Sequence, residues 1–215
     1  MTIDGTTEVD EGGAGRTDPA DLRSGLPIPG DDLARLRVRL ATRANDEALV
    51  DVGHRTVDSP LGPLLVAVTE RGIVRIAFER QGFDAALEEL ATRIGARVLE
   101  DPARTDPVAR QLDEYFDGRR RAFELPVDHR LAHGFRALVQ AALPDIPFGT
   151  TTSYGELARV VGRPGAARAV GTACATNPVP IVVPCHRVLR ADGSAGGYAG
   201  GEAAKRLLLA LERRA

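Results

Sequence analysis

The chain has 215 residues, of which 43% are hydrophobic and 27% are charged, a composition typical of a globular protein with one large or two small domains. No apolar run reaches the roughly 18–20 residues that cross a membrane, and the acidic N-terminus has no apolar segment of the signal-peptide kind. These features exclude a membrane protein and predict a cytoplasmic one.

The cysteines and histidines do not predict a metal site. Cys174 and Cys185 are too few for a four-thiolate zinc site, and a disulfide between them is not expected in a reducing cytosol. His129 and His133 have the spacing to share a helix face, but no further ligand lies near them in the sequence. We therefore expect no metal.

The net charge of −2 conceals an uneven distribution. Residues 130–215 contain 11 basic and 5 acidic residues, a net charge of +6, which leaves 17 basic and 25 acidic residues, a net charge of −8, for residues 1–129. A basic C-terminal half is typical of a protein that contacts a polyanion with one face, although the pattern alone is weak.

Residues 1–49 are predicted to be an N-terminal extension. Residues 1–23 are rich in Gly, Thr and Asp and lack hydrophobic periodicity, so we expect no fixed structure there. Leucines at helical spacing with arginines between them then predict a surface helix over Asp31–Ala48.

Residues 50–128 are predicted to form a small α/β domain on an antiparallel sheet. Turn residues separate short β-type runs, as in a meander, and two amphipathic segments follow. The triple arginine at 119–121 favours a solvated turn over a nucleic-acid patch. The predicted strands are Arg55–Ser59, Leu64–Val68, Ile73–Phe78 and Ala122–Leu125, and the predicted helices are Phe83–Gly95 and Pro107–Phe116.

Residues 129–215 are predicted to form a helical domain that contains a helix-turn-helix. A helix over Phe135–Leu143 ends at Pro144, and the next helix begins with a capping box of Ser153 and Glu156 and runs through Val161. After a Gly-containing turn, Pro164 is placed to start a helix over Ala166–Thr176. This helix has a face of small residues, which suits close approach to another surface and tight core packing equally well. The face consists of Ala166, Ala167, Ala169, Gly171 and Thr172.

The segment Asn177–Val188 contains the side chains that are best suited to catalysis. Its three prolines exclude a helix and predict an extended, rigid, partly buried segment that presents Cys185 beside His186. Neighbouring side chains on an extended segment face opposite ways, so His186 could act on Cys185 only across a bend or through a water molecule. The alternative is a buried, inert cysteine followed by a surface histidine.

This segment resembles the active-site signature of the O6-alkylguanine–DNA alkyltransferases, the methylated-DNA–protein-cysteine methyltransferases, whose Pro-Cys-His-Arg-Val run carries the acceptor cysteine. The resemblance continues without a gap from Pro147 to Glu212 and extends more loosely across the meander from Val57. The matching features, in order, are Ser153-Tyr154, the run 166–171, Asn-Pro-Val-Pro at 177–180, Gly-Tyr-x-Gly-Gly at 197–201, Lys205 and Glu212.

The resemblance implies an α/β (α+β) protein, with a small sheet-plus-helix domain followed by a helical domain with a winged-helix-like helix-turn-helix. It also implies direct reversal of DNA damage. An O6-alkylguanine would be flipped out of duplex DNA, and its alkyl group would move irreversibly to Cys185 in a single turnover; O4-alkylthymine is a second candidate substrate. The expected partner is double-stranded DNA contacted in the minor groove, with no cofactor and no obligate protein partner.

The resemblance assigns the catalytic roles as follows. Cys185 would be the nucleophile, His186 its base through a bridging water, and Glu212 the group that orients the imidazole. Tyr154 would donate a hydrogen bond or proton near N3 of the departing guanine. Asn177 would connect the recognition helix to the active-site segment through side-chain hydrogen bonds.

Further residues would bind the base. The carbonyl groups of Val188 and Cys185 would recognise the exocyclic amine, and the backbone N–H of Ala199 would lie at O6. The family often has Ser at position 199, but a backbone donor tolerates Ala. The packing around Pro180 and Tyr198 would set the width of the pocket, together with the Gly-flanked loop that contains Gly200, and Lys205, the only lysine, would support that loop.

The recognition helix would bind the DNA. Arg168 would enter the base stack in place of the flipped nucleotide, and the small residues around it suit a narrow minor groove. Three other interpretations are weaker. An alkyl-base sensor lacks the acceptor cysteine, a helix-turn-helix transcription factor gives Cys185 no purpose, and a cysteine hydrolase leaves Tyr154 and Arg168 unexplained.

Overall fold

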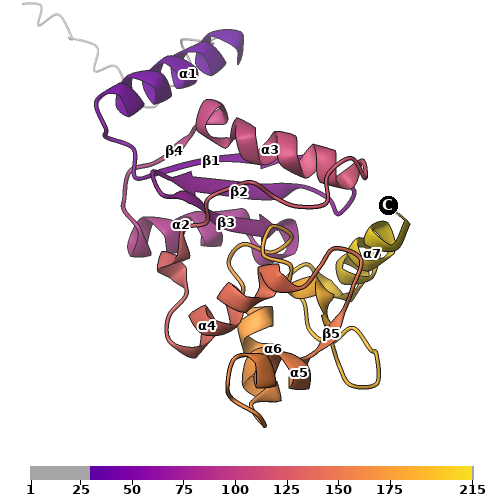
Figure 1. Ribbon diagram of the computed structural model, residues 1–215. Coiled ribbons are helices and arrows are strands. Elements are labelled where there is room, and N and C mark those ends of the chain that lie inside the picture. The colour runs from indigo at the N-terminus through magenta and orange to yellow at the C-terminus, as the bar shows by residue number, and fades with distance from the viewer. Residues whose placement is uncertain (1–29, 215) are drawn as a thin grey trace, which may run out of the picture. The chain divides into compact units, whose positions relative to one another are not determined.

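The computed structural model describes residues 30–214, so the prediction for residues 1–23 lies outside the described part of the chain. From Arg37 onward the described residues form one compact unit (Figure 1). The helices are α1 (Gly30–Asp46), α2 (Phe83–Arg93), α3 (Pro102–Phe116), α4 (Phe135–Ala142), α5 (Tyr154–Val160), α6 (Ala167–Ala175) and α7 (Gly201–Arg214). The strands are β1 (Val52–Val57), β2 (Leu64–Thr69), β3 (Gly72–Phe78), β4 (Val98–Glu100), β5 (Thr152–Ser153) and β6 (Val188–Leu189).

The main sheet has the strand order β3-β2-β1-β4. The predicted meander is confirmed, because β1, β2 and β3 pair antiparallel in sequence order, although β1 begins at Val52 rather than at Arg55. The prediction of a purely antiparallel sheet is wrong at one edge, where β4 pairs parallel to β1. A strand of three residues is too short to leave an alternating pattern in the sequence.

Helices cover both faces of this sheet, with α3 on one side and α2 on the other (Figure 1). Alternate residues of β2 explain the arrangement, since Leu64 and Val66 share a core cluster with Leu112 of α3. Ala67 belongs instead to the cluster that contains Leu90 of α2. Every residue of β2 is therefore buried, which accounts for its continuous apolar sequence.

Helix α3 begins five residues before the predicted start. Asp101 caps it by accepting a hydrogen bond from the Arg104 N–H at 3.1 Å, and Pro102 occupies the first turn, where its missing N–H has no cost. Pro107, which suggested a start, lies inside the helix.

The predicted strand Ala122–Leu125 is wrong. The Glu124 N–H donates to the side-chain oxygen of Gln111 at 2.8 Å, and the Gln111 amide nitrogen donates to the Glu124 carbonyl at 3.3 Å. A side chain of α3 thus satisfies the backbone groups that a neighbouring strand would otherwise pair.

The predicted helix-turn-helix is confirmed as α5 and α6. The capping box at the start of α5 has both of its hydrogen bonds, from the Glu156 N–H to the Ser153 hydroxyl and from the Ser153 N–H to the Glu156 carboxylate, at 3.1 and 2.8 Å. Pro164 does not start α6 as predicted, because Gly165 follows it with φ of 90° and the helix begins only at Ala167. Within residues 30–214, none of the helices is both long and apolar enough to cross a membrane.

Candidate active site

The segment after α6 is a tight loop rather than the uniformly extended stretch that was predicted. Ile181 has φ of 75°, which is strained for a β-branched residue, and an isolated bridge joins Pro180 to Val183. The loop ends in a 3-10 turn over Cys185–Arg187. Because this turn replaces the alternation of a strand, Cys185 and His186 both point into the interior, and both are buried.

Asn177 holds this loop in shape from the end of α6. Its side-chain N–H donates to the Val183 carbonyl at 2.8 Å and to the Cys185 Sγ at 3.1 Å, and its Oδ1 accepts from the Val179 N–H at 3.1 Å. Asn177 therefore connects the second helix of the helix-turn-helix directly to the sulfur atom.

Glu212 of α7 lies at the centre of a buried cluster of polar groups. Its Oε1 pairs with the His186 Nε2 at 2.8 Å, and the Arg187 guanidinium contacts both carboxylate oxygens, at 2.9 Å from Nη2 to Oε1 and 3.0 Å from Nε to Oε2. The Gly149 N–H donates to Oε2 at 3.1 Å, and the Tyr115 hydroxyl donates to Oε1 at 2.8 Å. The carboxylate is thus fully paired although its side chain is only 1% exposed.

These contacts set the protonation states of the pair. Burial alone would raise the pKa of Glu212, but hydrogen bonds from His186 and Arg187 lower it to about 2. Burial lowers the pKa of His186 below its ordinary 6.5, and the neighbouring Glu212 only partly opposes this effect. At neutral pH the pair therefore consists of a carboxylate and a neutral imidazole, which can accept a proton.

The Cys185 thiol is neutral in the free protein. Burial raises its pKa to about 11, against the opposing effects of the Asn177 hydrogen bond and the Lys205 charge. At neutral pH this thiol therefore keeps its proton, and only deprotonation would make the sulfur a strong nucleophile.

Tyr154 and Lys205 lie together beside the loop. The Lys205 Nζ donates to the Val188 carbonyl at 2.6 Å and to the Tyr154 hydroxyl at 3.4 Å, and Lys205 itself is fully buried. Burial raises the pKa of Tyr154 to about 12, so its hydroxyl remains a donor. Tyr154 also lines a pocket of about 590 Å³ whose wall includes Arg168, Arg190 and Gly196.

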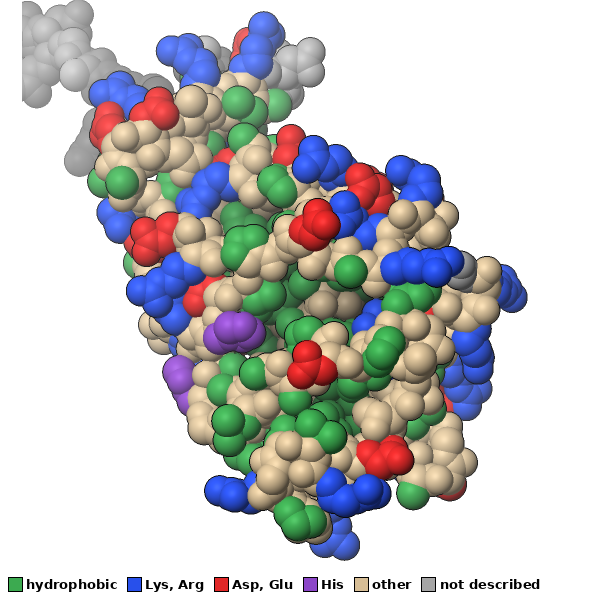
Figure 2. All heavy atoms as spheres, in the orientation of Figure 1, with side chains coloured by type: hydrophobic (Ala, Val, Ile, Leu, Met, Phe, Trp, Pro, Cys, Tyr) green, Lys and Arg blue, Asp and Glu red, His purple; other side chains and the backbone are tan. Residues whose placement is uncertain are grey.

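The outer face of α6 is the small-residue face noted in the sequence. Val170, Ala173 and Cys174 are buried on its inner side, whereas Arg168, Ala169 and Thr172 are exposed. The remaining members of the small face, Ala166, Ala167 and Gly171, are half-buried. The structure therefore favours an external contact surface over tight core packing, and Figure 2 shows basic side chains at this end, where α5 and α6 lie.

Tyr198 lies near His186, on the loop between β6 and α7. The Tyr198 ring is buried, packs edge-on against Phe78 at 5.6 Å, and lies 6.4 Å from the His186 ring. Within residues 30–214, the Tyr198 hydroxyl and the His186 Nδ1 are buried without a hydrogen-bond partner. Gly200 leaves no room for a side chain, since a Cβ would lie 2.6 Å from the Phe78 ring, and the neighbouring Ala199 is half-buried.

Two side chains of the Glu212 cluster were not predicted from the sequence. Arg187 belongs to the Pro-Cys-His-Arg-Val run, so the signature itself was a signal for it. Tyr115 carried no comparable signal, because it lies 97 residues from Glu212 in the chain. In the part of the chain that the structure describes, no group of three His, Cys, Asp or Glu side chains could hold a metal ion.

Two family models match the chain. Residues 52–129 match the 6-O-methylguanine DNA methyltransferase, ribonuclease-like domain, and residues 134–214 match the DNA binding domain of the same family. A methylated-DNA–protein-cysteine methyltransferase of Mycolicibacterium paratuberculosis is 42% identical over 163 residues, which cover 76% of this chain and 93% of that protein.

Two solved structures have the same fold. The Mycobacterium tuberculosis O6-methylguanine methyltransferase matches with a TM-score of 0.66 and 39% identity, over 76% of this chain and 93% of the other. A crystal structure of the Mycobacterium tuberculosis protein in complex with DNA matches with a TM-score of 0.65 and 40% identity, over 75% and 93% of the two chains.

Proposed function

Because the chain belongs to the methylated-DNA–protein-cysteine methyltransferase family, we propose that it flips an O6-alkylguanine out of duplex DNA and takes the alkyl group onto Cys185 in one irreversible turnover. The observation that carries the proposal is the buried arrangement of the Cys185 thiol, held by Asn177, beside the His186–Glu212 pair. A thiol, a neutral base and a group that orients the base form one of the arrangements that activate a nucleophile.

The reaction is a displacement at the alkyl carbon. The Cys185 sulfur forms a bond to that carbon as the bond from the carbon to guanine O6 breaks, and the bonding electron pair leaves with the guanine. The thiol proton passes to His186, whose positive form Glu212 stabilises. His186 Nδ1, which has no hydrogen-bond partner within residues 30–214, is the free acceptor, reached through a bridging water.

The departing guanine gains negative charge, which donors around the base would stabilise. Tyr154 would donate to N3, and Lys205, at 3.4 Å from the Tyr154 hydroxyl, would hold this donor in place. The backbone N–H of Ala199 would donate to O6, while Pro180, Tyr198 and Gly200 would bound the pocket.

The carbonyl groups of Cys185 and Val188 would accept from the exocyclic amine of the base. Each already accepts one hydrogen bond, from the Val188 N–H and from Lys205 respectively. A carbonyl oxygen has two lone pairs, so each retains one for the base.

The outer face of α6 would contact the minor groove. Its small residues would allow the backbone to approach the DNA closely. Arg168, which is exposed among them, would fill the space left by the flipped nucleotide. We propose in addition that residues 129–215 form the DNA-binding and acceptor domain, that residues 50–128 form the supporting α/β domain, and that residues 1–49 are an extension.

The stoichiometry of transfer tests this function. Incubation of the protein with duplex DNA that carries radiolabelled O6-methylguanine should transfer about one label per protein molecule, located on the peptide that contains Cys185, because a thioether does not return to a free thiol under these conditions. Lesion-free duplex is the control, and an O4-methylthymine duplex tests the second substrate. Release of free label beyond one equivalent would contradict the single-turnover mechanism.

Replacing Arg168 with Ala tests base flipping. The rate of transfer from duplex DNA should fall by about one to two orders of magnitude, because the cavity in the stack is no longer filled and unstacking costs a few kcal/mol. The rate with the free base O6-benzylguanine should stay within about twofold, since no flipping is needed. Arg163→Ala, in the turn before α6, is the matched control. An equal loss with both substrates would show that Arg168 acts on the chemistry instead.

A further inference from the structure

A tyrosine from the other half of the chain contacts the catalytic carboxylate. Tyr115 of α3 is fully buried, and its hydroxyl donates to the Oε1 of Glu212 at 2.8 Å. The same oxygen pairs with the His186 Nε2 at 2.8 Å. Residues 52–129, which include Tyr115, match the ribonuclease-like model, whereas His186 and Glu212 lie in the segment that matches the DNA binding model.

We propose that Tyr115 is a positioning residue for the reaction of Cys185. Its hydroxyl fixes the Glu212 oxygen that orients His186, and it also reduces the negative charge on that oxygen. The inference rests on the proposed roles of Cys185 and His186. It implies that the α/β domain contributes to the reactivity of the sulfur in addition to stabilising the fold.

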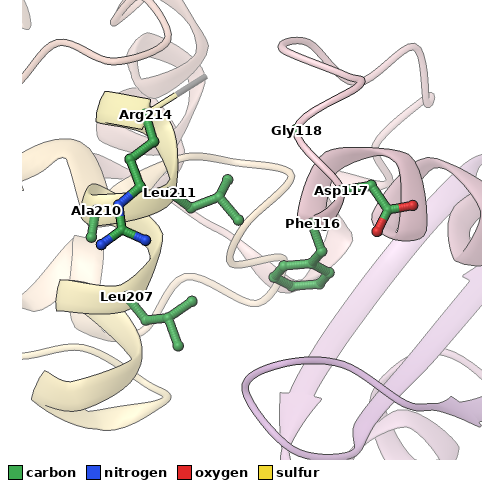
Figure 3. A pocket seen from close by; sticks show the side chains of 7 residues that line it. All are labelled: Phe116, Asp117, Gly118, Leu207, Ala210, Leu211 and Arg214. Carbon is green, nitrogen blue, oxygen red and sulfur yellow. The ribbon is translucent and has the colours of Figure 1, made fainter.

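The packing around the Tyr115 ring fixes the direction in which its hydroxyl points. Its ring packs against Phe123 at 5.2 Å, Phe116 at 5.5 Å and Phe148 at 6.2 Å. Phe116, the next residue of α3, points across a pocket toward Leu211 of α7, the helix that carries Glu212 (Figure 3). The aromatic cluster thus fixes the Tyr115 ring against the end of α7, and the hydroxyl has a geometric role that a mobile side chain could not perform.

Tyr115 acts only as a donor. Burial and the neighbouring negative charge of Glu212 raise the pKa of Tyr115 far above its ordinary value, so the hydroxyl keeps its proton. A neutral donor withdraws charge from the carboxylate oxygen, which weakens the hold of that oxygen on a protonated imidazole. The other titratable or charged groups that face the His186–Glu212 pair are Arg187, Lys205, Cys185 and Tyr198.

Replacing Tyr115 with Phe removes the hydroxyl and keeps the ring. We expect the rate of transfer to Cys185 at neutral pH to fall about fivefold, the effect of one hydrogen bond of average strength. The acidic limb of the pH–rate profile should also move to higher pH. Without the donor, Oε1 carries more charge and raises the pKa of His186, so the imidazole becomes neutral, and able to act as a base, only at higher pH.

Thr105→Val is the matched control. It removes another buried hydroxyl of α3, one that donates to the Asp101 carbonyl at 2.7 Å and does not contact Glu212. This variant should lose stability but keep the wild-type pH profile. The Tyr115→Phe change should have no further effect on the profile in a Glu212→Gln background, where the charge is absent.

The outcomes separate this inference from the proposed function. Wild-type protein that fails to label Cys185 refutes the function and, with it, the inference. Wild-type labelling combined with a Tyr115→Phe profile identical to that of Thr105→Val refutes the inference alone. A Tyr115→Phe shift that persists in the Glu212→Gln background would equally overturn it, because the hydroxyl would then not act through that carboxylate.

Discussion

Replacing Cys185 with Ser should abolish alkyl transfer and leave binding to a lesion-bearing duplex intact. A serine hydroxyl is far less acidic than a thiol and a much weaker nucleophile, and the His186–Glu212 pair cannot compensate for that difference. The new hydroxyl can still accept the hydrogen bond that Asn177 gives to the Cys185 Sγ at 3.1 Å, so the loop should keep its shape. Transfer is measured as radiolabel that stays on the denatured protein, and binding as fluorescence anisotropy of a labelled duplex.

The second cysteine supplies the control for this experiment. Cys174 is buried on the inner side of α6, and burial raises the pKa of its thiol well above the ordinary value. Cys174→Ser should therefore accept the same amount of label as the wild type, with some loss of stability from the buried hydroxyl. Label on the Cys185→Ser protein would mean that another atom is the acceptor, and the proposed mechanism would then be wrong.

The strands of the meander could be predicted because their sequence pattern is local. Leu64–Val68 is a short β-type run between turn residues, and the strand it predicts differs from β2 by a single residue. The capping box of Ser153 and Glu156 similarly depends on residues three apart and was found with both of its hydrogen bonds. Signals of this kind are complete within a few residues, so they can be interpreted without the rest of the fold.

The elements that were missed depend on distant partners. Strand β4 exists because β1, more than forty residues earlier in the chain, offers it an edge at Val52 and Gly53. The wrongly predicted strand at Ala122–Leu125 has suitable residues, but the Gln111 side chain occupies the backbone groups of Glu124. The sequence pattern cannot distinguish these two outcomes, because tertiary contacts decide them.

The candidate site also has features that could be predicted from the sequence and features that depend on the folded chain. Cys185, His186 and Val188 were named through the family resemblance, whereas Arg187 was not. Tyr154, Asn177 and Lys205 were named in the same way, and the structure places all three near Cys185. The protonation state of the sulfur could not be predicted from the resemblance, because burial raises the pKa of Cys185 to about 11. Burial is a property of the folded chain, and no motif records it.

Of the substitutions proposed above and here, Arg187→Met should lower the free energy of unfolding the most. The guanidinium contacts both oxygens of Glu212 and also donates to the Ile146 carbonyl at 2.7 Å. Its loss therefore leaves the buried carboxylate without a cationic partner. Breaking a buried ion pair from one side costs about 3–5 kcal/mol. Urea unfolding followed by circular dichroism at neutral pH should show this decrease in the free energy of unfolding. The variant should also transfer alkyl groups slowly, because Glu212 loses its orientation.

The pH dependence of this loss identifies its cause. In the wild type the folded pKa of Glu212 is about 2, below the ordinary 4.5, so its stabilisation is present above pH 4.5 and disappears as the pH falls toward 2. Without Arg187 the folded pKa rises, and the difference between the two proteins should therefore shrink over that acidic interval. Arg119→Met is the control, because the Arg119–Asp117 pair, at 2.7 Å, has side chains that are 63% and 61% exposed and should contribute little to the free energy of unfolding. A deficit of equal size at neutral and acidic pH would indicate lost packing of the arginine side chain rather than an unpaired Glu212, since packing does not depend on the protonation of a carboxylate.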